Sequence, residues 1–338
     1  MNIRDKWKGT VGRTVVLVSC CVLIEQALAQ DDRLPKGTVL RFSATSSEEE
    51  PFVRSVVFSP DGKAIATGSD DDTVALWNAT SGKLIARLEG HTNDVYCVAF
   101  SPDGKRLASA SRDDSIGLWE VATRKRVCQL DAHWASVSCL AFSPNGELLA
   151  SGGWDCDVMI WNVREKKLVH QLEGHQKRVL SVCFSPDNKN VASGCWDGTI
   201  ALWDAAAGKQ VAFFQAHSDD VTSVSYSPDG KLLASASDDK SVVFWDAVTH
   251  RPIRRLAGHE NWIMSVAFAP DGKLTATASA DGTIRLWNTE TGKQVRRLFP
   301  DLWGLSVSFS PDGKVLATSY ATGEVFFWNV DFEEAAKR

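Results

Sequence analysis

The sequence predicts an all-β fold built from seven copies of one four-stranded unit. Two markers recur in step along the chain. A tryptophan returns every 42 residues from Trp77 to Trp287, and Trp328 follows after 41 residues. A Ser-Pro-Asp-Gly-Lys motif or a close variant occurs seven times, first at 59–63 and last at 310–314. Self-similarity at a fixed period of this length indicates a repeat architecture, in which each unit stacks against its neighbours.

Each copy contains four short apolar segments separated by turn signals. The first is a V-x-x-V-x-F run such as Val95, Val98 and Phe100. It ends at the Pro-Asp-Gly turn, where proline presets φ and glycine takes the left-handed conformation; Asn188 replaces that glycine in the fourth copy. A second run of the LLASAS kind leads through Asp-Asp or Asp-Gly to the tryptophan run, such as VALWN, and a fourth run follows, as at 83–88. Alternating runs with turns about every 8–12 residues predict four antiparallel strands per copy.

The repeated motifs resemble those of the WD-repeat family. The signature consists of Trp-Asp or Trp-Asn dipeptides together with the Gly-His pairs Gly90-His91, Gly174-His175 and Gly258-His259. The seven copies cover residues 37–331, which is nearly all of the chain after its first thirty residues. This resemblance implies a seven-bladed β-propeller of four-stranded antiparallel blades around a central channel.

The last copy lacks a fourth strand, and the missing strand occurs at the other end of the propeller. Residues 38–43 (TVLRFS) align with the fourth-strand run LIARLE at 84–89 and precede the first copy. Because exposed sheet edges invite aggregation, we expect this N-terminal strand to complete the blade that contains Trp328 and so to close the ring.

The first thirty residues read as a secretory signal peptide. A basic start precedes an apolar run at 14–24 and the small-x-small sequence Ala27-Leu28-Ala29, which predicts cleavage after residue 29. The expected organisation is a signal peptide at 1–29, a linker at 30–36, the propeller at 37–331 and a tail at 332–338. We expect a periplasmic or secreted protein without stable membrane insertion. The alternatives are a cytoplasmic protein with an uncleaved N-terminus or a lipid anchor at Cys20.

Composition and motif content argue against several classes of function. The formal net charge is −5, whereas binding of nucleic acid or an anionic membrane surface needs a basic field. The sequence contains no phosphate-binding glycine loop, no H-E-x-x-H motif and no C-x-x-C pair. We therefore expect no metal, no cofactor and no enzymatic activity, and a closed ring gives no reason to require an oligomer.

Five copies carry a His, a Ser or Thr, an Asp and a Trp at the same relative positions. The sets are His91, Ser109, Asp113 and Trp119; His133, Ser151, Asp155 and Trp161; His175, Ser193, Asp197 and Trp203; His217, Ser235, Asp239 and Trp245; and His259, Thr277, Asp281 and Trp287. Ser, His and Asp together suggest nucleophilic catalysis, but an enzyme needs such a group once, beside one substrate pocket. The resemblance instead implies a structural relay of hydrogen bonds from indole to hydroxyl to imidazole to carboxylate, and no catalytic residue.

Candidate partner-binding residues follow from the same resemblance. In this family three positions per blade line the upper rim of the channel, two at the start of the first strand and one before the relay Asp. The candidates at these positions are Phe52, Arg54, Asp94, Tyr96, Arg112, Trp154, Arg178, Trp196, Trp262 and Trp303. Aromatic residues and arginine dominate interface energetics, and Trp154 and Trp196 occupy the same position of adjacent repeats.

The sequence therefore predicts a non-enzymatic scaffold that binds protein or peptide partners on one propeller face. Two alternatives stay open. The chain could bind a sugar or another small ligand on the rim tryptophans, or it could be a propeller enzyme whose channel site is not visible as a motif.

Overall fold

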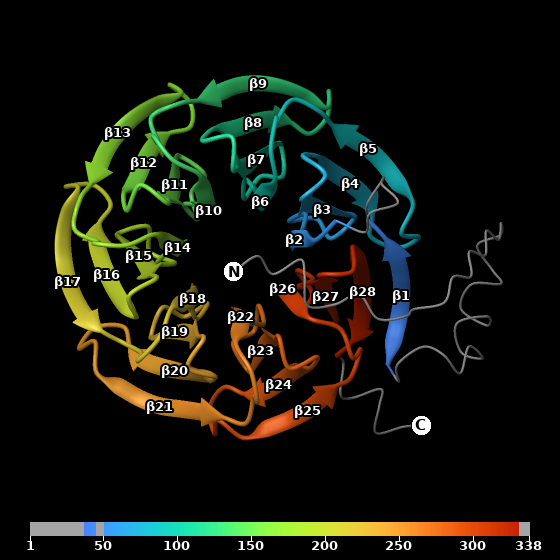
Figure 1. The fold of residues 1–338 in the computed structure, drawn as a ribbon, viewed down its shortest axis with the longest axis vertical. Coiled ribbons are helices and arrows are strands. Elements are labelled where there is room, and N and C mark those ends of the chain that lie inside the picture. The colour runs from blue at the N-terminus through green and yellow to red at the C-terminus, as the bar shows by residue number, and fades with distance from the viewer. Residues whose placement is uncertain (1–36, 45–50, 331–338) are drawn as a thin grey trace.

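The computed structural model describes residues 37–44 and 51–330, which form a closed ring of seven four-stranded antiparallel sheets (Figure 1). The described residues contain 28 strands and no helix, so none of them forms a helix that could cross a bilayer. The predicted seven-bladed propeller is confirmed. The expected signal peptide at 1–29, the linker at 30–36 and the tail at 332–338 lie outside the described residues.

Blades 1 to 7 follow chain order, and each runs outward from the channel. The innermost strands are β2 (Val53–Phe58), β6 (Val95–Phe100), β10 (Val137–Phe142), β14 (Val179–Phe184), β18 (Val221–Tyr226), β22 (Ile263–Phe268) and β26 (Gly304–Phe309). The second strands are β3 (Ala64–Ser69), β7 (Arg106–Ser111), β11 (Leu148–Gly153), β15 (Asn190–Cys195), β19 (Leu232–Ser237), β23 (Leu274–Ser279) and β27 (Val315–Tyr320). The third strands are β4 (Val74–Asn78), β8 (Ile116–Glu120), β12 (Val158–Asn162), β16 (Thr199–Asp204), β20 (Ser241–Asp246), β24 (Ile284–Asn288) and β28 (Glu324–Asn329). The outer strands are β5 (Leu84–Leu88), β9 (Lys125–Leu130), β13 (Lys167–Leu172), β17 (Lys209–Gln215), β21 (Pro252–Ala257), β25 (Gln294–Leu298) and β1 (Thr38–Ser43).

The hydrophobic core lies between adjacent blades rather than within any one of them. Five of the six residues of β7 are buried, whereas the outer strand β9 alternates exposed and covered residues. Trp119 of blade 2 is 1% exposed and packs in one cluster with Leu76 and Val74 of blade 1. A single blade cannot bury both of its faces, so each one depends on its two neighbours.

The N-terminal strand closes the ring as the sequence predicts. β1 pairs antiparallel with β28, with Arg41 opposite Phe326 and Phe42 opposite Val325 (Figure 1). Arg41 also forms an ion pair with Glu324. Both ends of the described chain therefore meet in blade 7, where β1 covers the edge that β28 would otherwise expose.

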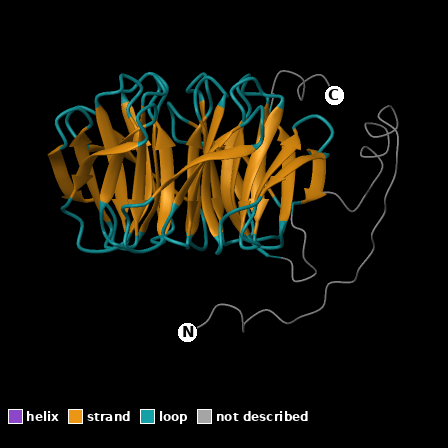
Figure 2. Cartoon of the chain, turned by 90° about the horizontal axis from the view of Figure 1, so that it is seen from above, coloured by secondary structure: helices purple, strands orange, loops and turns teal. Residues whose placement is uncertain are grey.

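The strands run between two faces that carry different loops (Figure 2). The Pro-Asp-Gly turns occupy one face, here called the turn face. Asn188 replaces glycine in one of these turns and adopts φ 65°, as expected for the residue type most tolerant of that conformation. The opposite face, here called the rim face, carries the histidine loops and the turns that precede the tryptophan strands. The relays and the candidate binding residues all lie at this end of the blades.

Candidate functional site

Four of the five expected relays form complete hydrogen-bond chains. In blade 2, Trp119 Nε1 donates to Ser109 Oγ at 2.8 Å, and His91 Nε2 lies 2.7 Å from the same hydroxyl. His91 Nδ1 lies 2.8 Å from the Asp113 carboxylate, which also accepts the backbone N–H of Thr92. The sets that contain His133, His217 and His259 have the same bonds. Each relay therefore ties the histidine loop to the turn before the tryptophan strand.

The pKa shifts and the burial of the relay residues are consistent with a structural role and not with catalysis. Burial acts to raise the pKa of Asp113, but hydrogen bonds from His91 and Ser115 outweigh it and hold the pKa well below its usual range. Burial lowers the pKa of His259. Against the effect of its burial, hydrogen bonds from His259 and Thr283 hold the pKa of Asp281 well below its usual range, so at neutral pH the relay of blade 6 is a neutral imidazole against an ionised carboxylate. Ser109 is fully buried and already bonded on two sides, so no substrate could reach its hydroxyl.

The relay expected in blade 4 is incomplete, and that prediction is wrong at one bond. His175 Nε2 bonds to Ser193 Oγ at 2.7 Å, and Trp203 Nε1 donates to that hydroxyl at 2.8 Å. The bond expected between His175 and Asp197 is not formed in this blade of the described structure. His175 Nδ1 keeps only a 3.3 Å contact with Thr199 Oγ1, which the complete relays of blades 2, 5 and 6 make in addition to their bond to the aspartate. The predicted chain therefore stops at the imidazole.

Cys195 gives the physical reason. The equivalent serines Ser111 and Ser237 each accept the backbone N–H of the relay aspartate at 3.0 Å. Cys195 Sγ donates to the carbonyl oxygen of Lys177 at 3.3 Å, as the two serines do to the equivalent carbonyls, but it also interacts with the carboxylate of Asp197. The thiol thus competes with the imidazole for the carboxylate.

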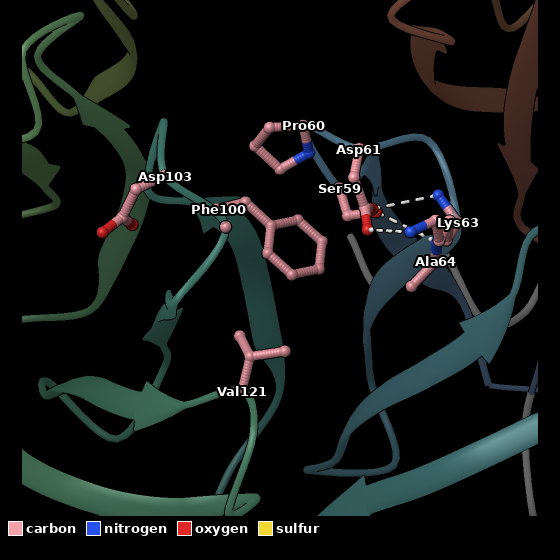
Figure 3. Close-up of a pocket in the computed structure, with 9 residues that line it drawn as sticks. Ser59, Pro60, Asp61, Lys63, Ala64, Phe100, Asp103 and Val121 are labelled. Atoms are coloured by element: carbon pink, nitrogen blue, oxygen red, sulfur yellow. Dashed lines mark hydrogen bonds and ion pairs between the residues drawn. The ribbon is translucent and has the colours of Figure 1, made fainter.

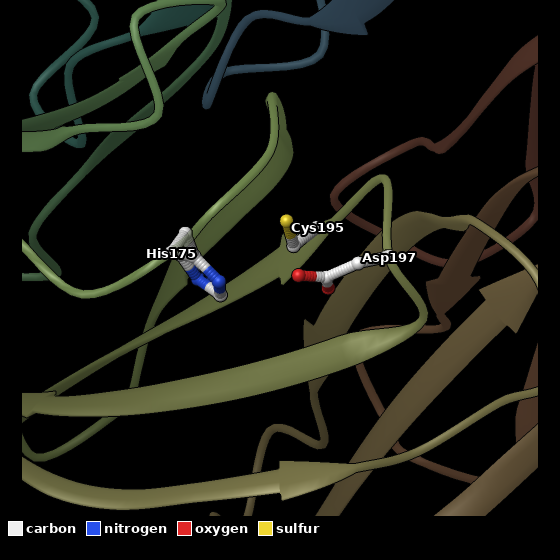
Figure 4. A group of neighbouring side chains, drawn as sticks. All are labelled: His175, Cys195 and Asp197. Carbon is white, nitrogen blue, oxygen red and sulfur yellow. The ribbon is translucent and has the colours of Figure 1, made fainter.

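The same three residues are the one group in the described ranges that could offer ligands to a metal ion. The ligand atoms of His175, Cys195 and Asp197 lie within 4.8 Å of one another, and the side chains face one small space (Figure 4). A thiol binds metal as the thiolate, but burial raises the pKa of Cys195 to about 12. Structural zinc sites also use four ligands. These observations favour a variant relay over a metal centre.

Blades 1 and 7, whose copies lack the histidine, use other side chains. In blade 1, Arg87 Nη1 lies 3.4 Å from the Asp71 carboxylate. In blade 7, Thr318 Oγ1 accepts Trp328 Nε1 at 2.8 Å and bonds to Tyr320 Oη at 2.7 Å. Tyr320 does not follow from the repeat motif, because it occurs in one copy only, whereas Arg87 has a counterpart in Arg255 of blade 5, which binds the relay carboxylate there at 3.0 Å.

One backbone hydrogen bond brings the candidate rim positions together in every blade. The N–H of the residue before the relay-Asp position donates to the carbonyl of the residue before the first strand. The seven pairs are Asp70 with Phe52, Arg112 with Asp94, Trp154 with Ser136, Trp196 with Arg178, Asp238 with Asp220, Ala280 with Trp262, and Ala321 with Trp303. In each blade this bond holds two rim residues next to each other at the channel mouth.

Eight of the ten candidate side chains touch in one continuous series, here called the aromatic–arginine arc. In order, the series is Trp196, Arg178, Trp154, Tyr96, Arg54, Phe52, Trp303 and Trp262. The guanidinium carbon of Arg178 lies 3.7 Å from the ring centroid of Trp154 and 4.3 Å from that of Trp196. Tyr96 stacks on Trp154 with centroids 5.8 Å apart. The arc passes through every blade except blade 5.

The rim arginines differ in how they are neutralised. Arg54 makes two bonds, of 2.6 and 2.7 Å, to the carboxylate of Asp70 in its own blade. The two remaining candidates, Arg112 and Asp94, pair with each other at 3.3 Å. Arg178 makes no ion pair within the described ranges. Its contacts are the two indoles.

Blade 5 places carboxylates in the gap of the arc. Burial, followed by the charge of Asp219, raises the pKa of Asp220 to about 6. Burial and then the charge of Asp220 raise the pKa of Asp238 to about 7. Asp238 Oδ1 is buried without a hydrogen-bond partner among the described residues. The rim face therefore carries aromatic side chains around most of its circumference, the cation of Arg178 without an ion pair among the described residues, and acidic side chains at blade 5.

One exposed aromatic residue of the rim face, Trp134, was not among the candidates predicted from the sequence. Trp134 follows the relay residue His133 and is 73% exposed. The residues at the same position in other copies are polar, namely Thr92, Gln176, Ser218 and Glu260. This single apolar departure was the available signal, but the family's rim positions do not include it.

A cavity lies on the turn face. It has a volume of about 380 Å³ and lies between the Pro-Asp-Gly turns of blades 1 and 2, lined by Pro60, Asp61, Lys63 and Phe100 among others (Figure 3). Its Ser59–Asp61 hydrogen bond recurs at Ser101–Asp103 and in four further blades. The lining is thus the repeated turn architecture and gives no distinct site.

Comparison with known proteins agrees with this architecture. A family model described as the IFT122 first beta-propeller matches residues 52–176 and 179–338. The chain belongs to the WD-repeat β-propeller family. It is also 39% identical over 54 residues to the general transcriptional corepressor TUP1 of Saccharomyces cerevisiae. That match covers 16% of this chain and 8% of the corepressor. Propellers of this family are in general non-enzymatic scaffolds for protein interactions.

These comparisons correct the expected localisation. The prediction of an exported protein is wrong, because the propeller family model and the transcriptional corepressor point to an intracellular protein. The six cysteines between 97 and 195 are free thiols. The prediction rested on a local pattern alone, a basic start, a short apolar run and a small-x-small sequence.

Proposed function

We propose that this propeller is a non-enzymatic recognition module that binds protein or peptide partners at the aromatic–arginine arc of its rim face. The observation that carries the proposal is the continuity of the arc from Trp196 to Trp262. Large aromatic side chains supply contact area at low entropic cost, and arginine adds directional donors. These residue types are the ones enriched at interface hot spots.

Exposure and rigidity both support this reading. Trp196 is 44% exposed and Trp262 is 41% exposed, so their rings are open to a partner. Backbone bonds at the channel mouth fix the turns that carry both rings, and a complete relay also fixes the loop of Trp262 in blade 6. A rigid aromatic surface loses little conformational entropy when it binds.

The two other classes of function have less support. Sugars stack on open aromatic faces, but Tyr96 and Arg178 already contact the ring of Trp154. An enzyme needs a reactive group within reach of a substrate, and the repeated serines, such as Ser109, are buried and bonded. A peptide that lies across the arc requires neither feature.

The proposal can be tested by selecting binders from a random peptide library with the full chain as bait. Affinities of the selected peptides would then be measured by fluorescence polarisation. Replacing both Trp154 and Trp196 with alanine should weaken binding by roughly a thousandfold. Truncating one hot-spot residue removes about 2 kcal/mol of binding free energy, so the pair removes about 4 kcal/mol, at about 1.4 kcal/mol per tenfold. Ile253→Ala on the outer strand β21 serves as the control. Equal binding by the double variant and the wild type would move the site off the arc.

A further inference from the structure

Arg178 stands out among the charged residues of the rim face because two tryptophans hold it. Its guanidinium carbon lies 3.7 Å from the Trp154 ring centroid on blade 3 and 4.3 Å from the Trp196 centroid on its own blade. Both distances are short enough for face-on contact with the indoles. A guanidinium stacked in this way loses its rotational freedom before any ligand arrives.

The repeat explains why this arginine has no acidic partner. In blade 1 the residue before the relay Asp is Asp70, and it neutralises Arg54. In blade 2 Asp94 occupies the position equivalent to Arg178 and pairs with Arg112. In blade 4 the residue before the first strand is Arg178, and the residue before the relay Asp is Trp196. An indole therefore occupies the position that the carboxylate of Asp70 has in blade 1.

The stacking also decides what the cation can bind. Both indole centroids lie within 4.3 Å of the guanidinium carbon, and the five N–H donors of a guanidinium point outward in its own plane. A carboxylate matches those donors with two parallel, charge-assisted hydrogen bonds. The chain has a net charge of −5, so there is no broad basic field to attract polyanions. Recognition would rest on this directional contact.

We propose that Arg178, held between Trp154 and Trp196, is the receptor for the carboxylate of a single Asp or Glu side chain in the bound peptide. This inference rests on the proposed function and specifies its ligand. A single acidic residue is expected because Asp220 and Asp238 occupy the neighbouring blade 5 and would repel an acidic run. Apolar residues that flank the acid would lie on the exposed part of Trp196.

The experiment uses heptapeptide pools with blocked termini. The central residue is Glu, Gln, Lys or phosphoserine, and the other six positions are randomised. Binding of each pool to the full chain is measured by fluorescence polarisation, for the wild type and for Arg178→Gln. Arg164→Gln is the matched control, because Arg164 is exposed on the turn face and its loss changes the net charge equally. Thermal unfolding of each variant checks that it folds.

We expect the Glu pool to bind the wild type about tenfold or more tightly than the Gln pool, since a charge-assisted pair is roughly twice as strong as a neutral one. Arg178→Gln should remove this preference, and Arg164→Gln should keep it. Arg178→Lys should restore only part of it, because an ammonium cannot make the two-pronged contact.

The other outcomes overturn the inference and separate it from the proposed function. If Glu and Gln pools bind equally and the double alanine variant at Trp154 and Trp196 loses both, the carboxylate receptor is refuted while the rim site stands. A preference for phosphoserine that depends on Arg178 would replace the carboxylate with a phosphate. If no pool binds, both the receptor and the proposed rim function fail.

Discussion

Cys195→Ser should complete the interrupted relay of blade 4. A serine at this position accepts the backbone N–H of the relay aspartate in blades 2 and 5, at 3.0 Å in both. With the thiol gone, Asp197 is free to turn to His175, as in the complete relays, where the bond to imidazole is 2.7–3.0 Å. A hydrogen bond to a charged group is worth about 1.5–3 kcal/mol. After the lost thiol contact is subtracted, the free energy of unfolding should rise by about 1 kcal/mol.

The substitution should also change how stability depends on pH. Burial lowers the pKa of His175 to about 4, opposed by the charge of Asp197. The unfolded state then binds more protons than the folded state between pH 4 and 6.5, so stability is lost as pH falls through that window. The loss from this histidine is roughly 3 kcal/mol, at about 1.36 kcal/mol per pKa unit. A direct bond to Asp197 raises the pKa of His175 and reduces the loss.

Urea unfolding of the wild type and Cys195→Ser at several pH values between 4 and 7.5 measures both effects. The difference between the two proteins isolates blade 4, because the other histidines are common to both. The stability gap should widen as the pH is lowered. A gap that is constant with pH, or a variant less stable than the wild type at neutral pH, would refute the competition between thiol and imidazole.

Three further predictions concern the ring and its rim. Asp238→Asn should stabilise the protein at pH 8 by on the order of 1 kcal/mol, after allowance for solvent screening. The raised pKa of Asp238 means that the free energy of unfolding falls as pH rises from about 4 to about 7, and asparagine removes that loss. A lower stability of the variant at pH 8 in urea unfolding would contradict this. Ser235→Ala leaves the buried Trp245 Nε1 and His217 Nε2 without their shared partner, so it should cost about 1–3 kcal/mol in thermal unfolding, and a neutral effect would count against the relay. Deletion of residues 37–44 exposes the edge of β28 and should lower the melting temperature and cause association on size-exclusion chromatography; a stable monomer would show that the clasp is dispensable.

Periodicity made most of the fold accessible from the sequence. The strand order, the closure of the ring by residues 38–43 and the residues of four complete relays all follow from seven aligned copies. Their positions are fixed by the repeat itself, so one copy predicts the next. Departures confined to one copy were not accessible, because nothing else in the chain repeats them. Tyr320 belongs to this class.

The finer geometry of the rim depends on contacts between blades. The sequence placed Trp154 and Trp196 at the same position of neighbouring copies, but it did not place Arg178 between them. That arrangement depends on side-chain direction at the channel mouth, which spacing alone does not fix. Likewise, Cys195 differs from serine by one atom, and the loss of the bond between His175 and Asp197 follows from hydrogen-bond strength rather than from pattern.

The central claim is that partners bind at the aromatic–arginine arc, and fluorine NMR of the full chain labelled with 5-fluorotryptophan tests it most directly. The chain has 13 tryptophans, of which seven are the repeat tryptophans of the core. Titration with a selected peptide should shift the resonances of Trp154 and Trp196 and leave those of buried Trp119 and Trp203 unchanged. Shifts confined to tryptophans outside the arc, or no shift of any resonance at saturating peptide, would contradict the account.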